Sequence, residues 1–405
     1  MSAPSPADAA TTTTAARRLG GQVVLRVLAR LGSAGMQAAT LLLLARALGP
    51  ASFGTLAVLA STGMLLCSVA GLGASTRVLR VSAEDGADRL APTLFWMQAI
   101  GLTLVLAGLL VTSLVLGDPA PAAVGALMAA SDQQAEFTVS SLSGHGRQLA
   151  ASVAITVQRG LPLIAVGAAD LAGLPVLGPV GVALVVVAVL AVVWAPRRWG
   201  GWRALRAAAR SSVGYWFSGL VVNLRQLEPL TVSTLGGAGA AGLYAIAARV
   251  SNPLTIVVTS MQAIAVPEMA RARDRDEFRR TFRLLFGLAL LYAGVLAAAS
   301  PLVASVFLWI VGPQYEPART LVTVMVLCAA LSAISQALAA RLLAVGRPAV
   351  SAWIIGVATV VGLVVLAVTA GVDGGRDLWV APLVTQSLIL VALAVVPVRP
   401  RNTSA

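Results

Sequence analysis

The stretch from Ser212 to Leu254 reads SVGYWFSGLVVNLRQLEPLTVSTLGGAGAAGLYAIAARVSNPL; it is apolar enough to cross a bilayer, yet it carries Arg225 and Glu228. A charged side chain at bilayer depth costs about 2.5–3.5 kcal/mol on insertion scales, so it normally faces a helix bundle or a water-filled cavity. Pro229 follows and lacks the N–H that would bond the carbonyl of Arg225. A carbonyl freed inside a membrane is tolerated only where protein or water reaches it. The stretch therefore predicts a membrane helix that lines a pathway.

The composition of the whole chain is typical of a protein with many membrane spans. Of its 405 residues, 58% are hydrophobic and 11% are charged, and the mean hydropathy is +0.88. An average soluble domain is about 25% charged, whereas repeated apolar runs of about 20 residues are typical of transmembrane helices. The net charge of +13 lies in short segments between the apolar runs, so it indicates membrane topology and no nucleic-acid partner.

The chain offers little for metal or covalent chemistry. Cys67 and Cys328 lie in apolar runs without a metal-ligand spacing and are interpreted as small buried hydrophobes. His145, the one histidine, stands in a predicted turn with no second ligand nearby. The segments between the apolar runs are too short for a separate enzyme. We therefore predict no metal, no cofactor and no enzymatic activity.

Twelve apolar spans are predicted along the chain. They cover residues 23–46, 53–74, 93–116, 121–142, 149–170, 176–195, 213–235, 240–266, 284–311, 318–343, 349–371 and 378–397. Arginines gather in alternate connections, so the positive-inside rule places these connections and both termini in the cytoplasm. The opposite connections contain only Arg319 and Arg376.

The two halves of the chain resemble each other. LGPASFGTLA (Leu48–Ala57), after the first span, echoes LGGAGAAGLYA (Leu235–Ala245), after the seventh, and Gly146-Arg147 echoes Gly346-Arg347. Equivalent positions share a side of the membrane, which predicts a parallel repeat about a pseudo-twofold axis along the membrane normal. We expect an all-α integral membrane protein of about twelve transmembrane helices in two six-helix lobes. The expected parts are a disordered cytoplasmic tail at 1–20, an N-terminal lobe at 21–204, a C-terminal lobe at 205–398 and a cytoplasmic tail at 399–405.

Three stretches together resemble the multidrug/oligosaccharidyl-lipid/polysaccharide exporter superfamily, in its polysaccharide-biosynthesis branch. The first is LARALGPASFGTLA (Leu44–Ala57), similar to the family's entry into its second span. The second is GLYAIAAR (Gly242–Arg249), which continues to VPEMAR (Val266–Arg271). The third is GPQYEPA (Gly312–Ala318), followed by LAVGR (Leu343–Arg347). By span order the resemblance covers nearly the whole chain.

The resemblance implies a transporter in the bacterial cytoplasmic membrane that moves polyprenyl-diphosphate-linked saccharides by alternating access, for cell-surface polysaccharide biosynthesis. Its implied partners are the lipid-linked oligosaccharide, membrane lipids and other polysaccharide assembly proteins. Three alternatives stay open. A drug antiporter of the multidrug and toxin extrusion type would have an acidic cavity, and a glycosyl polymerase or ligase would have a sizeable outer loop. A transport-dead scaffold is the third.

Arginines inside the spans are the predicted contacts for the diphosphate. The guanidinium group stays charged and binds phosphate oxygens bidentately. Arg159 and Arg225 fall near the midplane, one in each half, and Arg26, Arg30 and Arg249 complete the cationic set. Interfacial anchoring is the alternative for Arg26 and Arg30, and a tie between two helices is the alternative for Arg249.

Three acidic residues inside the spans have two possible roles, ion pairing and proton coupling. Arg225 and Glu228 stand three residues apart, which places them on one helix face. Asp132 and Glu136 share a face of the fourth span, where two carboxylates in a poor dielectric would raise at least one pKa. The alternative is that they pair with Arg159 of the next span.

Overall fold

A computed structural model describes residues 6–81, 87–115, 118–193, 201–272, 274–372 and 376–397, and over these ranges the chain is almost entirely helical. Seven of the described helices are long and apolar enough to cross a membrane. This confirms the prediction of an all-α membrane protein, whereas the count of twelve spans and the two-lobe arrangement stay predictions. The helices are α1 (Pro6–Ala70), α2 (Ala74–Val81), α3 (Ala87–Val115), α4 (Pro119–Gly144), α5 (Gln148–Leu171), α6 (Leu177–Val193), α7 (Gly201–Asn223), η1 (Leu224–Leu227), α8 (Glu228–Arg271), α9 (Arg275–Val311), η2 (Pro313–Ala318), α10 (Arg319–Ala344), α11 (Pro348–Val372) and α12 (Val380–Val395).

Packing divides the chain into two compact units. Unit 1 comprises Met1–Thr40, Leu66–Leu109 and Leu127–Gly219, and unit 2 comprises Leu41–Leu65, Leu110–Ala126 and Leu220–Ala405. Unit 2 therefore takes segments from both halves of the sequence.

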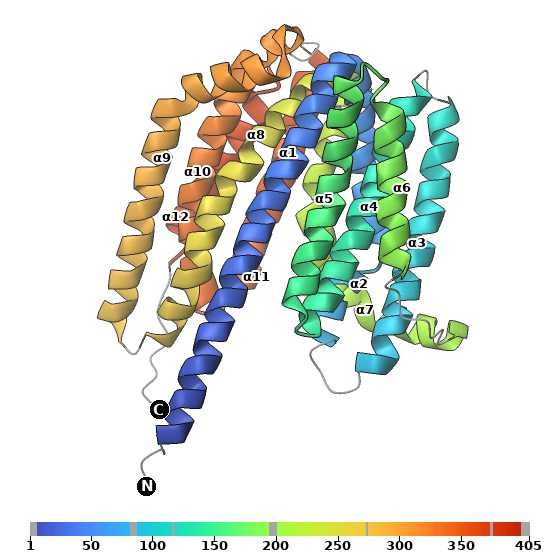
Figure 1. The fold of residues 1–405 in the computed structure, drawn as a ribbon. Coiled ribbons are helices and arrows are strands. Elements are labelled where there is room, and N and C mark those ends of the chain that lie inside the picture. Colours follow the sequence, from blue (N-terminus) through green and yellow to red (C-terminus); the bar gives the residue numbers. More distant parts are fainter. Residues whose placement is uncertain are drawn as a thin grey trace. The chain divides into compact units, whose positions relative to one another are not determined.

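Unit 1 is built on helices that run side by side, among them α4, α5 and α6 (Figure 1). Its apolar core joins four elements, with Val78 of α2, Phe95 of α3, Phe137 of α4 and Ala208 of α7 in one cluster. Phe95 and Phe137 meet edge to face, with ring centroids 5.8 Å apart. The core thus ties the beginning of α7 to α2, α3 and α4.

Unit 2 is organised around α10, which contacts α8, α9, α11 and α12 (Figure 1). Among the candidate membrane spans, the one that contains α10 has the largest buried share, 61% of its window. Near the end of α10, Arg341 donates from Nη2 to the carbonyls of Leu393 and Val396 at 2.7 and 3.0 Å. These carbonyls belong to the end of α12, where the last turn of a helix lacks internal donors.

Both α1 and α8 bend at a glycine. Gly49 has φ 73° and ψ 171°, and Gly237 has φ 84° and ψ 168°, so the two bends share one backbone conformation. A residue with a side chain rarely adopts it. The bends fall between the first and second and between the seventh and eighth predicted spans. The sequence echo between Leu48–Ala57 and Leu235–Ala245 is therefore also an echo in backbone conformation.

The two bends cross each other within unit 2. A Cβ on Gly54 would overlap the carbonyl oxygen of Ala238, and a Cβ on Gly242 would overlap that of Pro50. Gly54 lies five residues after Gly49, just as Gly242 lies five residues after Gly237. The contact is therefore reciprocal, as a local pseudo-twofold axis requires.

Side chains of η2 support the bend in α1. Pro50 has no N–H, so the carbonyl of Arg46 loses its helical partner, and Gln314 donates to this carbonyl from Nε2 at 3.0 Å. The hydroxyl of Tyr315 donates to the preceding carbonyl, that of Ala45, at 3.1 Å. Tyr315 is fully buried. The GPQYEPA motif, which follows the ninth predicted span, thus satisfies the backbone of the first.

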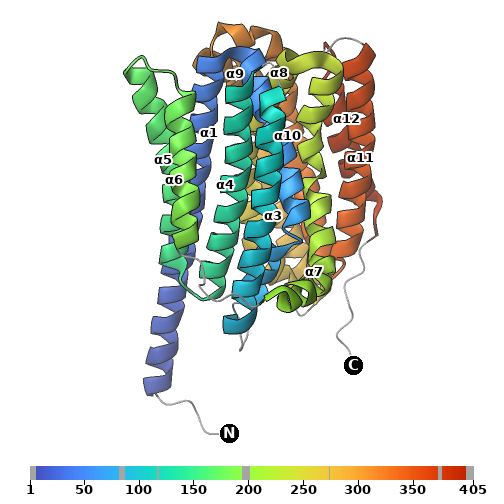
Figure 2. The same cartoon turned by 90° about the vertical axis from the view of Figure 1, so that its right-hand side faces the viewer.

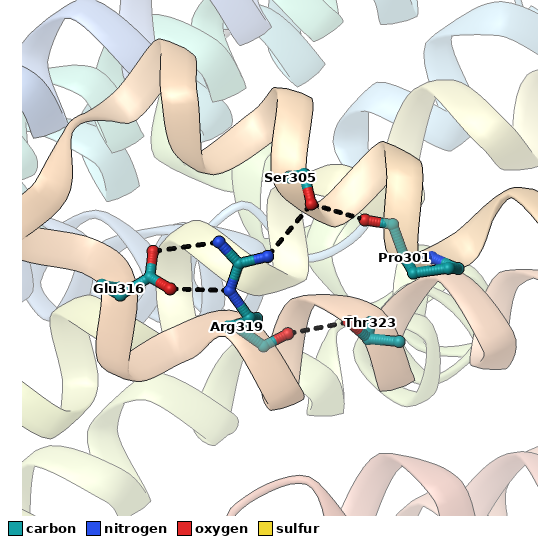
Figure 3. A network of polar contacts seen from close by, with 5 residues as sticks. All are labelled: Pro301, Ser305, Glu316, Arg319 and Thr323. Carbon is teal, nitrogen blue, oxygen red and sulfur yellow. Dashed lines mark hydrogen bonds and ion pairs between the residues drawn. The ribbon is translucent and has the colours of Figure 1, made fainter.

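An arginine fastens η2 to the helices on either side. Arg319 donates to both carboxylate oxygens of Glu316, from Nε at 2.6 Å and from Nη2 at 3.2 Å (Figure 3). Its Nη1 donates to the hydroxyl of Ser305 on α9 at 3.0 Å. The network is exposed, so it contributes little to the free energy of unfolding. Its main effect is to hold η2 in place.

Candidate functional site

A small pocket, with a volume of about 20 Å³, opens within unit 1 between α1, α4, α5 and α6. One ion pair, two amides and a hydroxyl stand among apolar side chains in its lining. Such a mixture is typical of ligand sites, in which a few polar groups orient a molecule that apolar groups shield from water. The lining residues are Gln37, Thr40, Met128, Asp132, Gln158, Arg159, Pro162, Val180 and Leu184.

Asp132 is the centre of the polar part of the pocket. Its Oδ1 accepts from Arg159 Nη1 at 2.6 Å and from Gln158 Nε2 at 2.9 Å. Its Oδ2 accepts from Gln37 Nε2 at 3.4 Å. The donors come from α1 and α5, so one carboxylate on α4 joins three helices. A charge removed from bulk water is stable only when it is paired and its remaining lone pairs are hydrogen-bonded, as here.

Arg159 keeps most of its hydrogen-bonding capacity. A guanidinium has five N–H donors, and within the described part of the chain only Nη1 has a partner. The side chain is 20% exposed, and it lines the pocket. Arg159 can therefore hold Asp132 and still donate to an oxygen-rich anion that enters the pocket.

A second polar cluster lies in unit 2, around η1 and the beginning of α8. Arg225 Nε donates to Glu228 Oε1 at 3.2 Å, and the hydroxyl of Tyr244 donates to Glu228 Oε2 at 2.9 Å. The Arg225 side chain is 50% exposed and that of Glu228 is 17% exposed. Glu228 is thus held from both sides, and the Arg225 side chain is half-exposed.

The sequence predicts that the carbonyl of Arg225 lacks a helical hydrogen-bond partner, and the structure shows that this prediction is wrong. Residues Leu224–Leu227 form a 3₁₀ turn, and the N–H of Glu228 bonds the Arg225 carbonyl in place of the N–H that Pro229 lacks. A 3₁₀ turn shortens the hydrogen-bond spacing by one residue, which is a common way to satisfy a helix end. The chain therefore bends here without an orphaned carbonyl.

The remaining predicted residues stand apart from these two clusters. Glu136 is exposed, one turn along α4 from Asp132, and the ion pairs described in the structure do not include it. Arg249 is half-buried on α8 and has an interaction partner. Arg26 and Arg30 belong to α1, but their side chains lie outside the described residues.

Sequence reasoning missed Gln37, Gln158 and Tyr244, which donate three of the five hydrogen bonds to the two carboxylates. The signal that was available is the presence of amide side chains inside apolar spans, where an unsatisfied polar group is costly. His145 is exposed in its turn, as predicted, and Cys67 and Cys328 are buried. Among the described residues, His, Cys, Asp and Glu do not gather into a group that could hold a metal.

Several solved transporter structures have the same fold as this chain. An inward-facing multidrug resistance MATE family transporter of the MOP superfamily matches with a TM-score of 0.60 at 16% identity, over 91% of this chain and 92% of the other. A MATE protein in complex with MaL6 matches with a TM-score of 0.59 at 16% identity, over 92% and 94% of the two chains. A third match, a MOP superfamily transporter from Pyrococcus furiosus described as having reverse polarity of its binding pocket, has a TM-score of 0.52 at 15% identity, over 92% and 93%.

The chain therefore has the fold of the MATE transporters of the MOP superfamily. No family model and no curated protein sequence matches it. The closer likeness to the polysaccharide-biosynthesis branch stays a prediction from the sequence.

Proposed function

We propose that the chain is a transporter of the bacterial cytoplasmic membrane that moves polyprenyl-diphosphate-linked saccharides by alternating access, with both termini in the cytoplasm. The observation that carries this proposal is the charge balance of the pocket in unit 1. Asp132, the one carboxylate among the residues that line it, is neutralised by Arg159, and Arg159 keeps donors for another anion.

The proposed substrate sets a limited physical task. Its isoprenoid tail can stay in the lipid, so only the sugar and the diphosphate need a polar route. Planar arginine donors suit phosphate oxygens, and their charge does not depend on pH in the physiological range. Arg159 in unit 1 and the half-exposed Arg225 in unit 2 supply such donors, one in each half of the sequence.

Asp132 would serve as the counterion of the empty pocket. Removing one partner of a buried pair leaves an uncompensated charge, which costs about 3–5 kcal/mol. An incoming diphosphate competes with Asp132 for Arg159, and the ion pair between Asp132 and Arg159 forms again when the substrate leaves.

The crossing of the two bends in unit 2 supports the proposal of alternating access. A transporter of this kind needs a contact that closes one side of the pathway and can separate again. Backbones that meet at Gly54 and Gly242 pack closely through van der Waals contact and small residues, as membrane helices often do. Such a contact holds without bulky interlocking side chains that would resist separation.

A drug antiporter is the second candidate, favoured by the likeness of the fold to multidrug resistance transporters. A pocket for cationic drugs requires an acidic group that is free to pair with them. The ion pair between Asp132 and Arg159 argues against this candidate, because Asp132 is already neutralised.

A deletion strain tests the proposal. Loss of the gene should remove the surface glycan and leave its lipid-linked precursor on the cytoplasmic face of the membrane. Arg159→Ala should fail to restore export at a normal protein level. Arg319→Ala is the matched control, because it also breaks an arginine–carboxylate ion pair but lies outside the pocket. A strain with normal glycan that becomes sensitive to cationic dyes would favour the drug antiporter.

A further inference from the structure

The first three turns of α7 form a two-faced helix outside the pocket and the bends. Ala208 and Ser212 face inward and are 2% and 0% exposed. Arg203, Arg206 and Arg210 are all exposed. At about 100° per residue these three arginines fall within an arc of about 60°, so their side chains leave the helix on one side. The arrangement is that of an amphipathic helix with a cationic face.

The orientation of this face is fixed by contacts on the opposite side. Arg77 of α2 donates from Nη1 to the carbonyl of Ala208 at 2.8 Å and to the hydroxyls of Ser211 and Ser212 at 2.8 and 2.7 Å. Leu205 packs against the apolar cluster shared by α2, α3 and α4. Figure 2 shows the beginning of α7 at a steep angle to the helices of unit 1, at one end of them.

The charge of the face has no acidic counterpart in its own segment. From Pro196 to Leu227 the sequence contains no Asp or Glu. Arg77, the charged side chain that the described contacts bring to this segment, is itself cationic. The first turns of α9 are different, because there Asp274, Asp276 and Glu277 alternate with arginines. Among the described residues, the ion pairs do not include Arg203, Arg206 or Arg210, so this face can bind anions from outside the chain.

Anionic lipid headgroups would supply such anions at the level where this helix enters the membrane. The helix that carries Arg210 continues to Asn223. The seventh predicted span begins at residue 213, three residues after Arg210, so Arg210 lies close to the level at which this apolar span leaves the hydrocarbon. Trp202, at the edge of the cationic face, is 70% exposed. Tryptophan is enriched at the headgroup level of bilayers.

We infer that the face formed by Arg203, Arg206 and Arg210, with Trp202 at its edge, is a docking surface for the phosphates of anionic membrane lipids. Basic amphipathic helices bind anionic bilayers through buried apolar area and electrostatic attraction together. The inference is independent of the transported substrate. A failed lipid-binding test would therefore leave the proposed function unaffected, and a failed transport test would leave the lipid site unaffected.

Lipid titration of the purified full-length chain tests the inference. Dibrominated phosphatidylglycerol is added in a neutral detergent, and the quenching of Trp202 is isolated by subtracting the signal of Trp202→Phe. Each arginine at a lipid surface changes affinity about fivefold. The triple variant R203Q/R206Q/R210Q should therefore bind on the order of a hundredfold more weakly, and salt should weaken the wild type in the same direction.

Two controls separate a site from a general charge effect. R279Q/R280Q/R283Q in α9 removes the same number of exposed charges and should leave the quenching curve unchanged. R203K/R206K/R210K should keep most of the affinity because it keeps the charge. Equal quenching by dibrominated phosphatidylcholine, or a triple glutamine variant of α7 that binds like the wild type, would overturn the inference.

Discussion

Gly54 and Gly242 occupy equivalent places in the two bends of unit 2, and each lies where a side chain would overlap the backbone of the other bend. The overlap would involve the carbonyl of Ala238 on one side and that of Pro50 on the other. Both glycines are helical, so it is the close approach and not the backbone conformation that requires them. The repeat in the sequence has thus produced a symmetric contact between backbones.

Replacing either glycine by alanine should separate the bends. Overpacking in a close contact costs about 1–3 kcal/mol, so Gly54→Ala and Gly242→Ala should each lower the thermal midpoint of the purified protein. Gly239→Ala is the matched control, because it lies in the same bend of α8 with open space around it. An unchanged midpoint in both test variants would contradict the close crossing.

Removing the hydroxyl of Tyr315 should weaken the support of the bend in α1. Tyr315→Phe keeps the packing but leaves the Ala45 carbonyl without this donor, at a cost of about 1 kcal/mol. Gln314→Ala should cost less, because Gln314 is exposed and water can replace it. The comparison is made by chemical or thermal unfolding in detergent; a larger loss for Gln314→Ala than for Tyr315→Phe would refute this ranking.

Neutralising Asp132 should destabilise unit 1 through Arg159. Asp132→Asn leaves the guanidinium partly buried without its counterion, and we expect a loss of up to about 3–5 kcal/mol. The double variant D132N/R159Q should recover much of that loss, because it removes both charges. Glu136→Gln, one turn away and exposed, serves as the control. Additive losses in the double-mutant cycle would show that the two residues are not coupled.

The role of Arg225 can be separated from that of Glu228. If Arg225 contacts the substrate, Arg225→Gln should abolish glycan export, while Glu228→Gln should leave measurable export because Tyr244 can still hold the amide. Equal protein levels on an immunoblot are the control for folding. Loss of export in Glu228→Gln together with full export in Arg225→Gln would assign the function to the carboxylate.

The sequence determined the membrane class and the places where the chain bends. Hydropathy is a local property, so it located the apolar helices, and Gly49-Pro50 and Gly236-Gly237 marked the interruptions within α1 and α8. The pairing of Arg225 with Glu228 also follows from their spacing of three residues. These features depend on neighbours within one helix.

Tertiary structure alone decided which polar groups meet across the bundle. Gln37 reaches Asp132 over 95 residues and Tyr315 reaches Ala45 over 270. In a soluble helix the apolar stripe shows which face is buried. In a membrane helix, lipid and core are both apolar, so hydropathy does not distinguish the inward face from the outward one. The partners of Asp132 and of the bend at Gly49 therefore became visible only when the helices were packed.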